Sequence, residues 1–290
     1  MTELLWVLYS AGYLALAVIF LLLAKKIFDG VTSYSLNTQL TAKDNPAVGL
    51  LLGGFMLGVT AVLCGVLAGD APDEPTWANF SEDLVPVLIY GLIGMVMLFV
   101  AGIFNDKIVL RQFSNHKEIV DNQNSAVAVI MAATYIGSGL IIAGGISSSL
   151  NMVSALIAFI VGQAAFILFG IIYQVVTKYD DQEEIGKNKN LAAGIAFAGN
   201  LIAFAMILMR GLRIDIELAV TWTLGDRCLN ALYYAIAGAV LLIITRIITD
   251  RAFLPGGKIS EEIVRDRNLN AGYIEAALAL SVGAVLVACL

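Results

Sequence analysis

Apolar and polar positions alternate along this chain in long blocks. Polar segments separate apolar blocks of about twenty residues, and each block can cross a hydrocarbon core of about 30 Å as a helix. The blocks run from Leu4 to Phe28, Pro46 to Ala68, Leu84 to Phe104, Ser125 to Gly145, Asn151 to Val176, Leu191 to Met209, Cys228 to Thr249 and Leu269 to Leu290. The pattern predicts an all-α integral membrane protein with eight transmembrane helices.

Composition agrees with a lipid environment. Hydrophobic residues make up 59% of the 290 positions and charged residues 14%, whereas soluble domains carry roughly 25% charged residues. The chain has three cysteines, in or beside apolar blocks, and His116 as its single histidine. This argues against a disulfide framework and a histidine-rich metal site. No cofactor and no metal are expected.

The basic residues are strongly asymmetric between alternate loops. Segments 25–45, 106–124, 177–190 and 246–267 hold 14 of the 17 lysines and arginines. Because cytoplasmic loops of membrane proteins are enriched in these residues, we expect these four segments in the cytoplasm. Both termini are then predicted on the opposite, outer side, which would be the periplasm in a bacterial inner membrane.

The chain repeats itself. With a shift of 145 residues, Ile27, Val31, Thr32, Tyr34, Asn45, Ala47, Gly49 and Gly54 fall on Ile172, Val176, Thr177, Tyr179, Asn190, Ala192, Gly194 and Gly199. With a shift of 144, Asp106, Glu118, Ile119, Val120 and Asn124 fall on Asp250, Glu262, Ile263, Val264 and Asn268. Apolar composition does not explain matches at polar residues. We therefore predict an internal duplication, residues 1–145 and 146–290, of four-helix halves inserted as parallel repeats.

A weaker similarity relates the two hairpins inside each half. Every second helix opens with an asparagine: Asn45, Asn124, Asn190 and Asn268. Asparagine is a strong helix N-cap, and capping is the simpler interpretation. The alternative is that these helix N-termini attract an anion. Glycine and alanine are dense in the same helices, which favours close helix packing, within one chain or between copies in a homo-oligomer.

Glu275 is the one carboxylate well inside a predicted span, about 10 Å along the helix from Asn268. A buried acid in a membrane suggests function, such as proton coupling or cation binding. The alternatives are a structural pair with a basic residue such as Arg246, or contact with water. Further polar candidates for the same interior are Asn200, Gln163 and Thr134, with Tyr135 and Ser138. Each of these is also explained by an interhelical hydrogen bond.

The basic loops mix charges of both signs, which predicts short solvated amphipathic pieces or, alternatively, a docking surface for a cytoplasmic protein. The sequence has no Walker loop, dinucleotide fingerprint or nucleophile elbow. Too few titratable residues converge for acid–base catalysis. We expect neither an enzyme nor a nucleic-acid partner.

Two runs, VTKYDDQEEIGKNKNLAAGIAFAGN and ITDRAFLPGGKISEEIVRDRNLNAGYIEAAL, resemble the domain of unknown function 350 family, the YjfL-like bacterial inner-membrane proteins. The resemblance would give this chain four tandem hairpin units. It is carried by Thr177, Tyr179, Asp180, Asn190, Leu254, Pro255, Gly256, Glu262, Asp266, Asn268 and Glu275. The first half departs from the pattern, with Met131 where Glu275 would align. The resemblance implies a bacterial plasma-membrane protein and no particular activity.

Two functions follow as hypotheses. The first is a transporter or channel-like component for a cation, proton or small solute, with Glu275 facing a hydrated cavity. The second is a membrane scaffold or anchor that recruits a cytoplasmic enzyme or assembles a larger complex. The second predicts a dry bundle with a well-ordered cytoplasmic surface.

Overall fold

The computed structural model describes residues 2–68, 74–147, 152–214, 221–254 and 257–290, and within these ranges it contains helices and no strand. Eight of the helices are long and apolar enough to span a membrane. They are α1 (Thr2–Val31), α2 (Pro46–Leu67), α3 (Trp77–Ile108), α5 (Ser125–Ser147), α6 (Met152–Val176), α7 (Leu191–Leu212), α9 (Leu224–Ala252) and α11 (Leu269–Cys289). The predicted fold class is confirmed.

Some helices extend beyond the apolar blocks that predicted them. Helix α3 begins at Trp77 instead of Leu84, after Thr76, whose side chain accepts a hydrogen bond from the Asn79 amide at 3.2 Å. Helix α9 begins after a capping box between Thr223 and Asp226. Hydropathy marks the part of a helix that lies in lipid, whereas backbone hydrogen bonding continues until a cap ends it.

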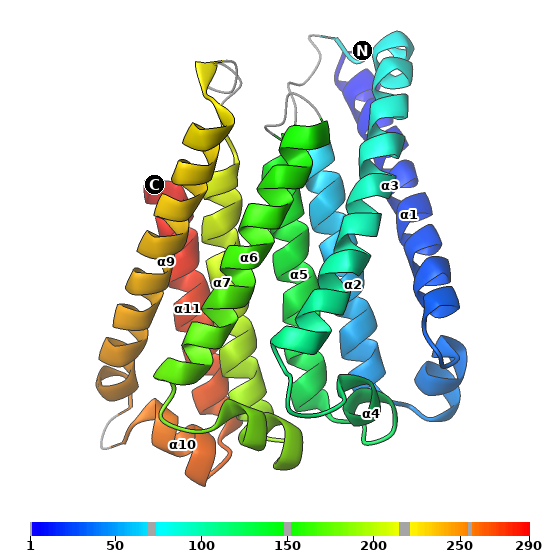
Figure 1. The fold of residues 1–290 in the computed structure, drawn as a ribbon. Helices are drawn as coiled ribbons and strands as arrows, with labels where there is room; N and C mark the ends of the chain where they lie inside the picture. Colours follow the sequence, from blue (N-terminus) through cyan, green and yellow to red (C-terminus); the bar gives the residue numbers. More distant parts are fainter. Residues whose placement is uncertain (1, 69–73, 148–151, 215–220, 255–256) are drawn as a thin grey trace.

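Short helices lie together at one end of the bundle. They are η1 (Thr38–Ala42), α4 (Asn115–Val120), η2 (Glu183–Lys187) and α10 (Ile259–Arg265). Each precedes one of the helices α2, α5, α7 and α11. Both chain ends lie toward the opposite end (Figure 1). We call the first the short-helix end.

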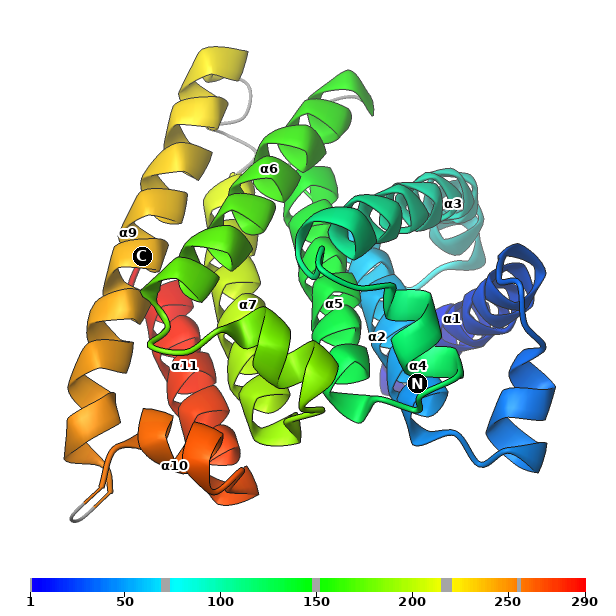
Figure 2. The same cartoon turned by 60° about the horizontal axis from the view of Figure 1, so that its bottom comes forward.

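The spanning helices form two layers (Figure 2). Helices α2, α5, α7 and α11 form an inner row, and their successive pairs make the most extensive contacts in the molecule. Helices α3, α6 and α9 each lie against two successive helices of that row, whereas α1 packs mainly on α2 and α3. The core therefore follows the inner row, and α5 and α7 are the most deeply buried spans.

Small residues set the spacing in the inner row. A Cβ atom added at Gly54 would lie 2.3 Å from Cα of Ala132, and one added at Gly199 would lie 2.5 Å from Cα of Ala276. Such contacts leave no room for a side chain, so the backbones touch. In lipid, where burying apolar surface gains little between helices, this close packing is a main source of helix association.

Candidate functional site

The same backbone turn joins each short helix to its inner helix. The residues with positive φ in the described chain, glycine aside, are Asp44, Gln123, Lys189 and Arg267, at 46°, 48°, 51° and 49°. Each immediately precedes Asn45, Asn124, Asn190 or Asn268. A left-handed conformation is uncommon for such residues, so its recurrence shows that the four units share one local structure.

These four asparagines, which we call the linking asparagines, cap the helices that follow them. Asn45 Oδ1, for example, accepts from the amides of Ala47 and Val48 at 3.0 and 3.3 Å. Each side-chain amide also donates to the side chain six residues earlier. These acceptors are Gln39, Glu118, Glu184 and Glu262, at 3.0, 3.1, 2.9 and 3.1 Å. The sequence comparison matched Glu118 with Glu262 but missed the recurrence at Gln39 and Glu184, which superposing all four units would have revealed.

Three linking asparagines also join one unit to the next. The side-chain amide of Asn45 donates to the Ile119 carbonyl at 3.0 Å. That of Asn124 donates to the Ile185 carbonyl at 3.0 Å, and that of Asn190 to the Ile263 carbonyl at 2.8 Å. Each acceptor is in the following unit, five residues before that unit's own linking asparagine. The caps therefore have a second role, which is to connect successive units.

Glu275 of α11 is buried and paired. Its Oε1 atom lies 2.7 Å from Arg246 Nε of α9. The hydroxyl of Tyr173 donates to the same oxygen at 3.0 Å, and the Asn200 amide lies 3.5 Å away. The Arg246 guanidinium also lies over the Tyr173 ring, 4.4 Å from its centroid. The structure thus brings Glu275 together with Asn200 and with Arg246, the structural partner that the sequence offered as an alternative.

The space beside this pair is very small. A cavity of about 10 Å³ is lined by both charged side chains and by Asn200, with Leu242 and Leu278 among its apolar neighbours. A cavity needs about 10–15 Å³ to hold one water molecule. Within the described residues, the carboxylate of Glu275 therefore faces its partners beside a space that holds about one water molecule at most.

A second acid, Asp181, lies in the same cluster, between α6 and η2. Its side chain is 1% exposed and accepts a hydrogen bond from Thr177 through Oδ2, while Oδ1 has no hydrogen-bond partner within the described residues. Burial raises the pKa of Asp181 to about 7, and Glu275 and Asp180 also raise it, against the lowering effects of Thr177 and Arg246. The cluster thus has two acids for one arginine.

Asp181 also borders a pocket at the short-helix end. The pocket has a volume of about 310 Å³ and is lined by polar residues that include Arg111, Gln112, Gln174 and Asp180. Asp181 was not expected to be functional, because the acidic run around it reads as a solvated loop. Its burial depends on how the segment between α6 and η2 packs against the rest of the bundle, which no local pattern shows.

The other predicted polar residues do not join this cluster. Gln163 forms a closed ring with Asn105 and Ser138: the Gln163 amide donates to Asn105 at 2.8 Å, Asn105 donates to Ser138 at 3.1 Å, and Ser138 donates to Gln163 at 2.9 Å. Thr134 donates to the Met131 carbonyl of its own helix at 2.8 Å. Gln163 therefore links α3, α5 and α6, and the four candidates do not form one polar interior.

The first half has an apolar version of the same region. It carries Phe28, Leu36, Phe55, Gly102 and Met131 where the second half carries Tyr173, Asp181, Asn200, Arg246 and Glu275. A cavity of about 530 Å³ opens there, bordered by Phe28, Gly102 and Met131. The fold can therefore be built without the charged pair, and the two halves have diverged at this place.

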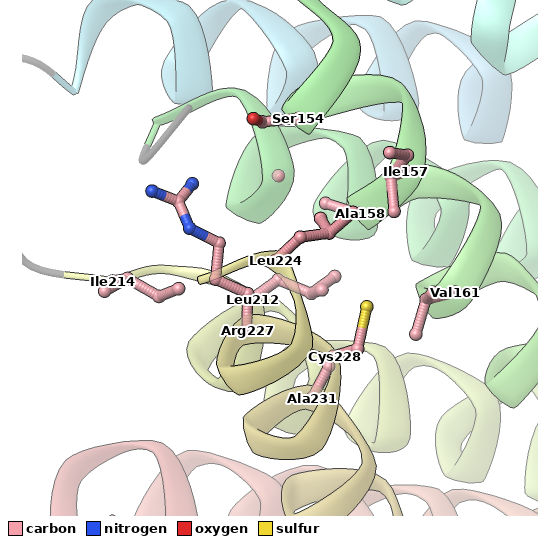
Figure 3. A pocket seen from close by; sticks show the side chains of 11 residues that line it. Ser154, Ile157, Ala158, Val161, Leu212, Ile214, Leu224, Arg227, Cys228 and Ala231 are labelled. Carbon is pink, nitrogen blue, oxygen red and sulfur yellow. The ribbon is translucent and has the colours of Figure 1, made fainter. Parts of the chain in front are cut away.

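One further cavity lies between α6 and α9, away from the short-helix end. Figure 3 shows Ile157, Ala158 and Val161 facing Cys228 and Ala231 across it, with Leu212 beside them. Its volume of about 20 Å³ has room for about one water molecule. Its small size and mostly apolar walls, with Ser154 and Arg227 at one side, indicate a packing gap. Within the described residues, no group of His, Cys, Asp and Glu could hold a metal ion.

The fold and these repeated junctions define a multi-pass helical membrane protein made of tandem hairpin units. The chain belongs to the Domain of Unknown Function (DUF350) family, whose model matches residues 2–146 and again residues 147–290. The predicted family is confirmed, and the two matches agree with the duplication read from the sequence.

Curated relatives are also transmembrane proteins. A UPF0719 transmembrane protein of Aquifex aeolicus is 25% identical over 135 residues, which are 47% of this chain and 48% of the relative. The UPF0719 transmembrane protein YshE of Bacillus subtilis is 29% identical over 136 residues, which are 47% of this chain and 91% of the relative. The match thus spans about half of the first relative and nearly all of the second. No solved structure matches the chain.

Replacing Arg246 alone by methionine should destabilise the protein by about 3–5 kcal/mol, because Glu275 is left as a buried charge without its partner. The double variant Arg246→Met/Glu275→Met should recover most of this loss, as Met131 already occupies the corresponding place in the first half. Unfolding of the purified protein in detergent measures both. A single variant as stable as the wild type would show that the pair does not form.

Replacing Asp181 by asparagine should change how stability depends on pH. Between pH 3.8 and about 7 the folded chain keeps a proton on Asp181 that the unfolded chain releases. Folding stability contributed by this group therefore falls as the pH rises through that window. Thermal unfolding of Asp181→Asn should lose this slope, and the exposed control Asp121→Asn should keep it. An unchanged slope in Asp181→Asn would contradict the assignment.

Proposed function

We propose that this multi-pass membrane protein is a scaffold that acts by binding other proteins, and that it is neither a conducting pore nor an enzyme. The observation that carries the proposal is the closed interior. The inner row packs backbone against backbone at Gly54 and Gly199. The buried charge of Glu275 is neutralised by Arg246, beside a cavity of about 10 Å³.

An ordered surface at the short-helix end also supports a scaffold. There each short helix precedes a linking asparagine, and Asn45, Asn124 and Asn190 tie consecutive units together. We place this end in the cytoplasm of a bacterial cell, because the four segments that form or lead into it, 25–45, 106–124, 177–190 and 246–267, carry 14 of the 17 basic residues. A rigid layer of mixed charge at the membrane surface suits a binding platform.

Transport of a proton or cation is the second candidate function. The pocket of about 310 Å³ that reaches Asp181 favours it, as does the excess of one acid in the cluster. A group with a pKa of about 7 can exchange protons with the cytoplasm near neutral pH. Transport would require a further conformation that opens the cluster toward the other side of the membrane.

An ion-flux assay in liposomes separates the two functions. We expect proton, sodium and potassium flux through the reconstituted wild-type protein to equal that of protein-free liposomes, because the packed row has no hydrated path. The matched variant is Glu275→Gln, which removes the charge and keeps the shape of the side chain. Flux in the wild type that falls in Glu275→Gln would overturn the scaffold proposal and establish the transport candidate.

A further inference from the structure

We infer that the inner row continues from one molecule to the next, with α11 of one copy packed against α2 of a second copy. The inference deepens the proposed scaffold function and rests on it, because it names a second copy of the chain as a partner. It comes from comparing the three occupied interfaces of the row with its two ends.

The occupied interfaces repeat one set of contacts. Between α5 and α7 and between α7 and α11, the fourth residue after a linking asparagine meets the second residue after the preceding linking asparagine. A Cβ added at Gly194 would lie 2.7 Å from the Ala126 carbonyl oxygen, and one added at Gly272 would lie 2.6 Å from that of Ala192. Farther along the helices, the ninth residue after one linking asparagine meets the eighth residue after the next, in the contacts of Gly54 with Ala132 and of Gly199 with Ala276.

At the first end of the row, α2 carries the same small residues without another spanning helix of the described chain packed against them. Gly53 occupies the position of Ala132 and Ala276, and a Cβ added there would meet no atom within 4 Å. Gly49 occupies the position of Gly194 and Gly272, and its added Cβ would meet only Leu40, at 3.9 Å. Farther along the same face, Thr60 and Cys64 are exposed.

At the other end, α11 exposes the complementary positions. Ala277 corresponds to Gly54 and Gly199, and Ser281 corresponds to Gly58 and Ala203, counted from the linking asparagines. Both Ala277 and Ser281 are exposed, as is Ala288. The two ends therefore carry the two halves of the interface that the row uses three times internally.

The last linking asparagine supplies an independent observation. Asn45, Asn124 and Asn190 are buried to 2% exposure or less, and each donates to a carbonyl of the following unit. Asn268 is half-buried, and its amide donates within the described chain to Glu262 of its own unit. The equivalent acceptor in a following first unit is the carbonyl of Leu40, in η1. If α2 of a second copy packs against α11 as α11 packs against α7, the Leu40 carbonyl of that copy comes close to the side-chain amide of Asn268.

Helix α1 also lacks a neighbour. Of its most apolar stretch 17% is buried, compared with 44% for α3, 39% for α6 and 28% for α9. The last three each lie against two inner helices, whereas α1 lies against α2. Helix α11 of a second copy would be the second inner helix against which α1 packs. The inferred contact between α11 and α2 therefore covers α1 as well as α2.

The lengths of the relatives agree with docking between copies. About half of this chain covers 91% of the Bacillus subtilis relative. A protein of that size has one pair of units, so the contact that joins α5 to α7 here has no counterpart within a single copy. In the present chain the duplication places α5 and α7, the two partners of that contact, in one polypeptide. A head-to-tail contact of this kind uses different surfaces on each partner, so it builds rings or open arrays.

Cysteine cross-linking in liposomes tests the inferred contact. In the interface between α7 and α11, a Cβ added at Gly283 would lie 3.1 Å from Cβ of Ala203. Across two copies, Thr60 takes the place of Gly283 and Ser281 takes the place of Ala203. Disulfides need Cβ atoms about 3.5–4.5 Å apart. In a chain with Cys64→Ala, Cys228→Ser and Cys289→Ser, the pair Thr60→Cys and Ser281→Cys should give dimers and higher oligomers on oxidation.

The controls make the result decisive. Thr60→Cys alone and Ser281→Cys alone should give no cross-linked species, and Gly53→Leu added to the pair should abolish the ladder. Gly30→Leu should leave the ladder intact, because Gly30 also has open space around it but lies outside the interface. Helical, monodisperse protein with no ladder would overturn the inference, as would cross-linking in either single variant.

The ion-flux assay on the same liposomes keeps the two proposals apart. Absent flux together with an absent ladder would leave the scaffold function standing and reject a second copy as its partner. Flux that depends on Glu275 would reject the scaffold function, whatever the state of assembly.

Discussion

The whole structure depends on how helix ends are satisfied at the surface of a membrane. The first amides of a helix have no partner within the helix, and leaving them unpaired near lipid is costly. This chain solves the problem with one residue type in one local structure, an asparagine that follows a left-handed residue. Because the side chain both caps its helix and donates to the next unit, the element that ends one helix also fixes the position of the following hairpin. Glycine and alanine then let the inner helices meet at the distance that this link imposes.

On that common frame the two halves have diverged. The second half buries Arg246, Glu275 and Asp181 where the first has Gly102, Met131 and Leu36. Burying charges costs free energy unless they are paired and hydrogen-bonded. This cluster contains one more acid than arginines. The apolar half shows that the fold does not require the cluster. The charged cluster is therefore a feature of the second half, added to a frame that both halves share.

The sequence predicted the parts of this structure that depend on local pattern. Apolar blocks gave the eight spans, asparagine at every second helix gave the caps, and Glu275 was recognised because an acid inside a span is rare. Polar partnerships were predicted less well, since they depend on which helices become neighbours. Gln163 pairs with Asn105 and Ser138, away from Glu275, because α6 crosses α3 and α5 at that level. Asp181 looked like a solvated acid, and only tertiary packing at the end of α6 buries it.

The central claim is that the linking asparagines connect units as well as cap helices, and comparing two alanine variants tests it most directly. Both variants remove a cap and the hydrogen bond to the glutamate six residues earlier, but in an isolated molecule only Asn190→Ala also leaves a carbonyl of the following unit, that of Ile263, without its donor. In monomeric detergent-solubilised protein, the free energy of unfolding should fall further for Asn190→Ala, by about 1–3 kcal/mol. Equal losses in the two variants would show that the units are not joined through these side chains.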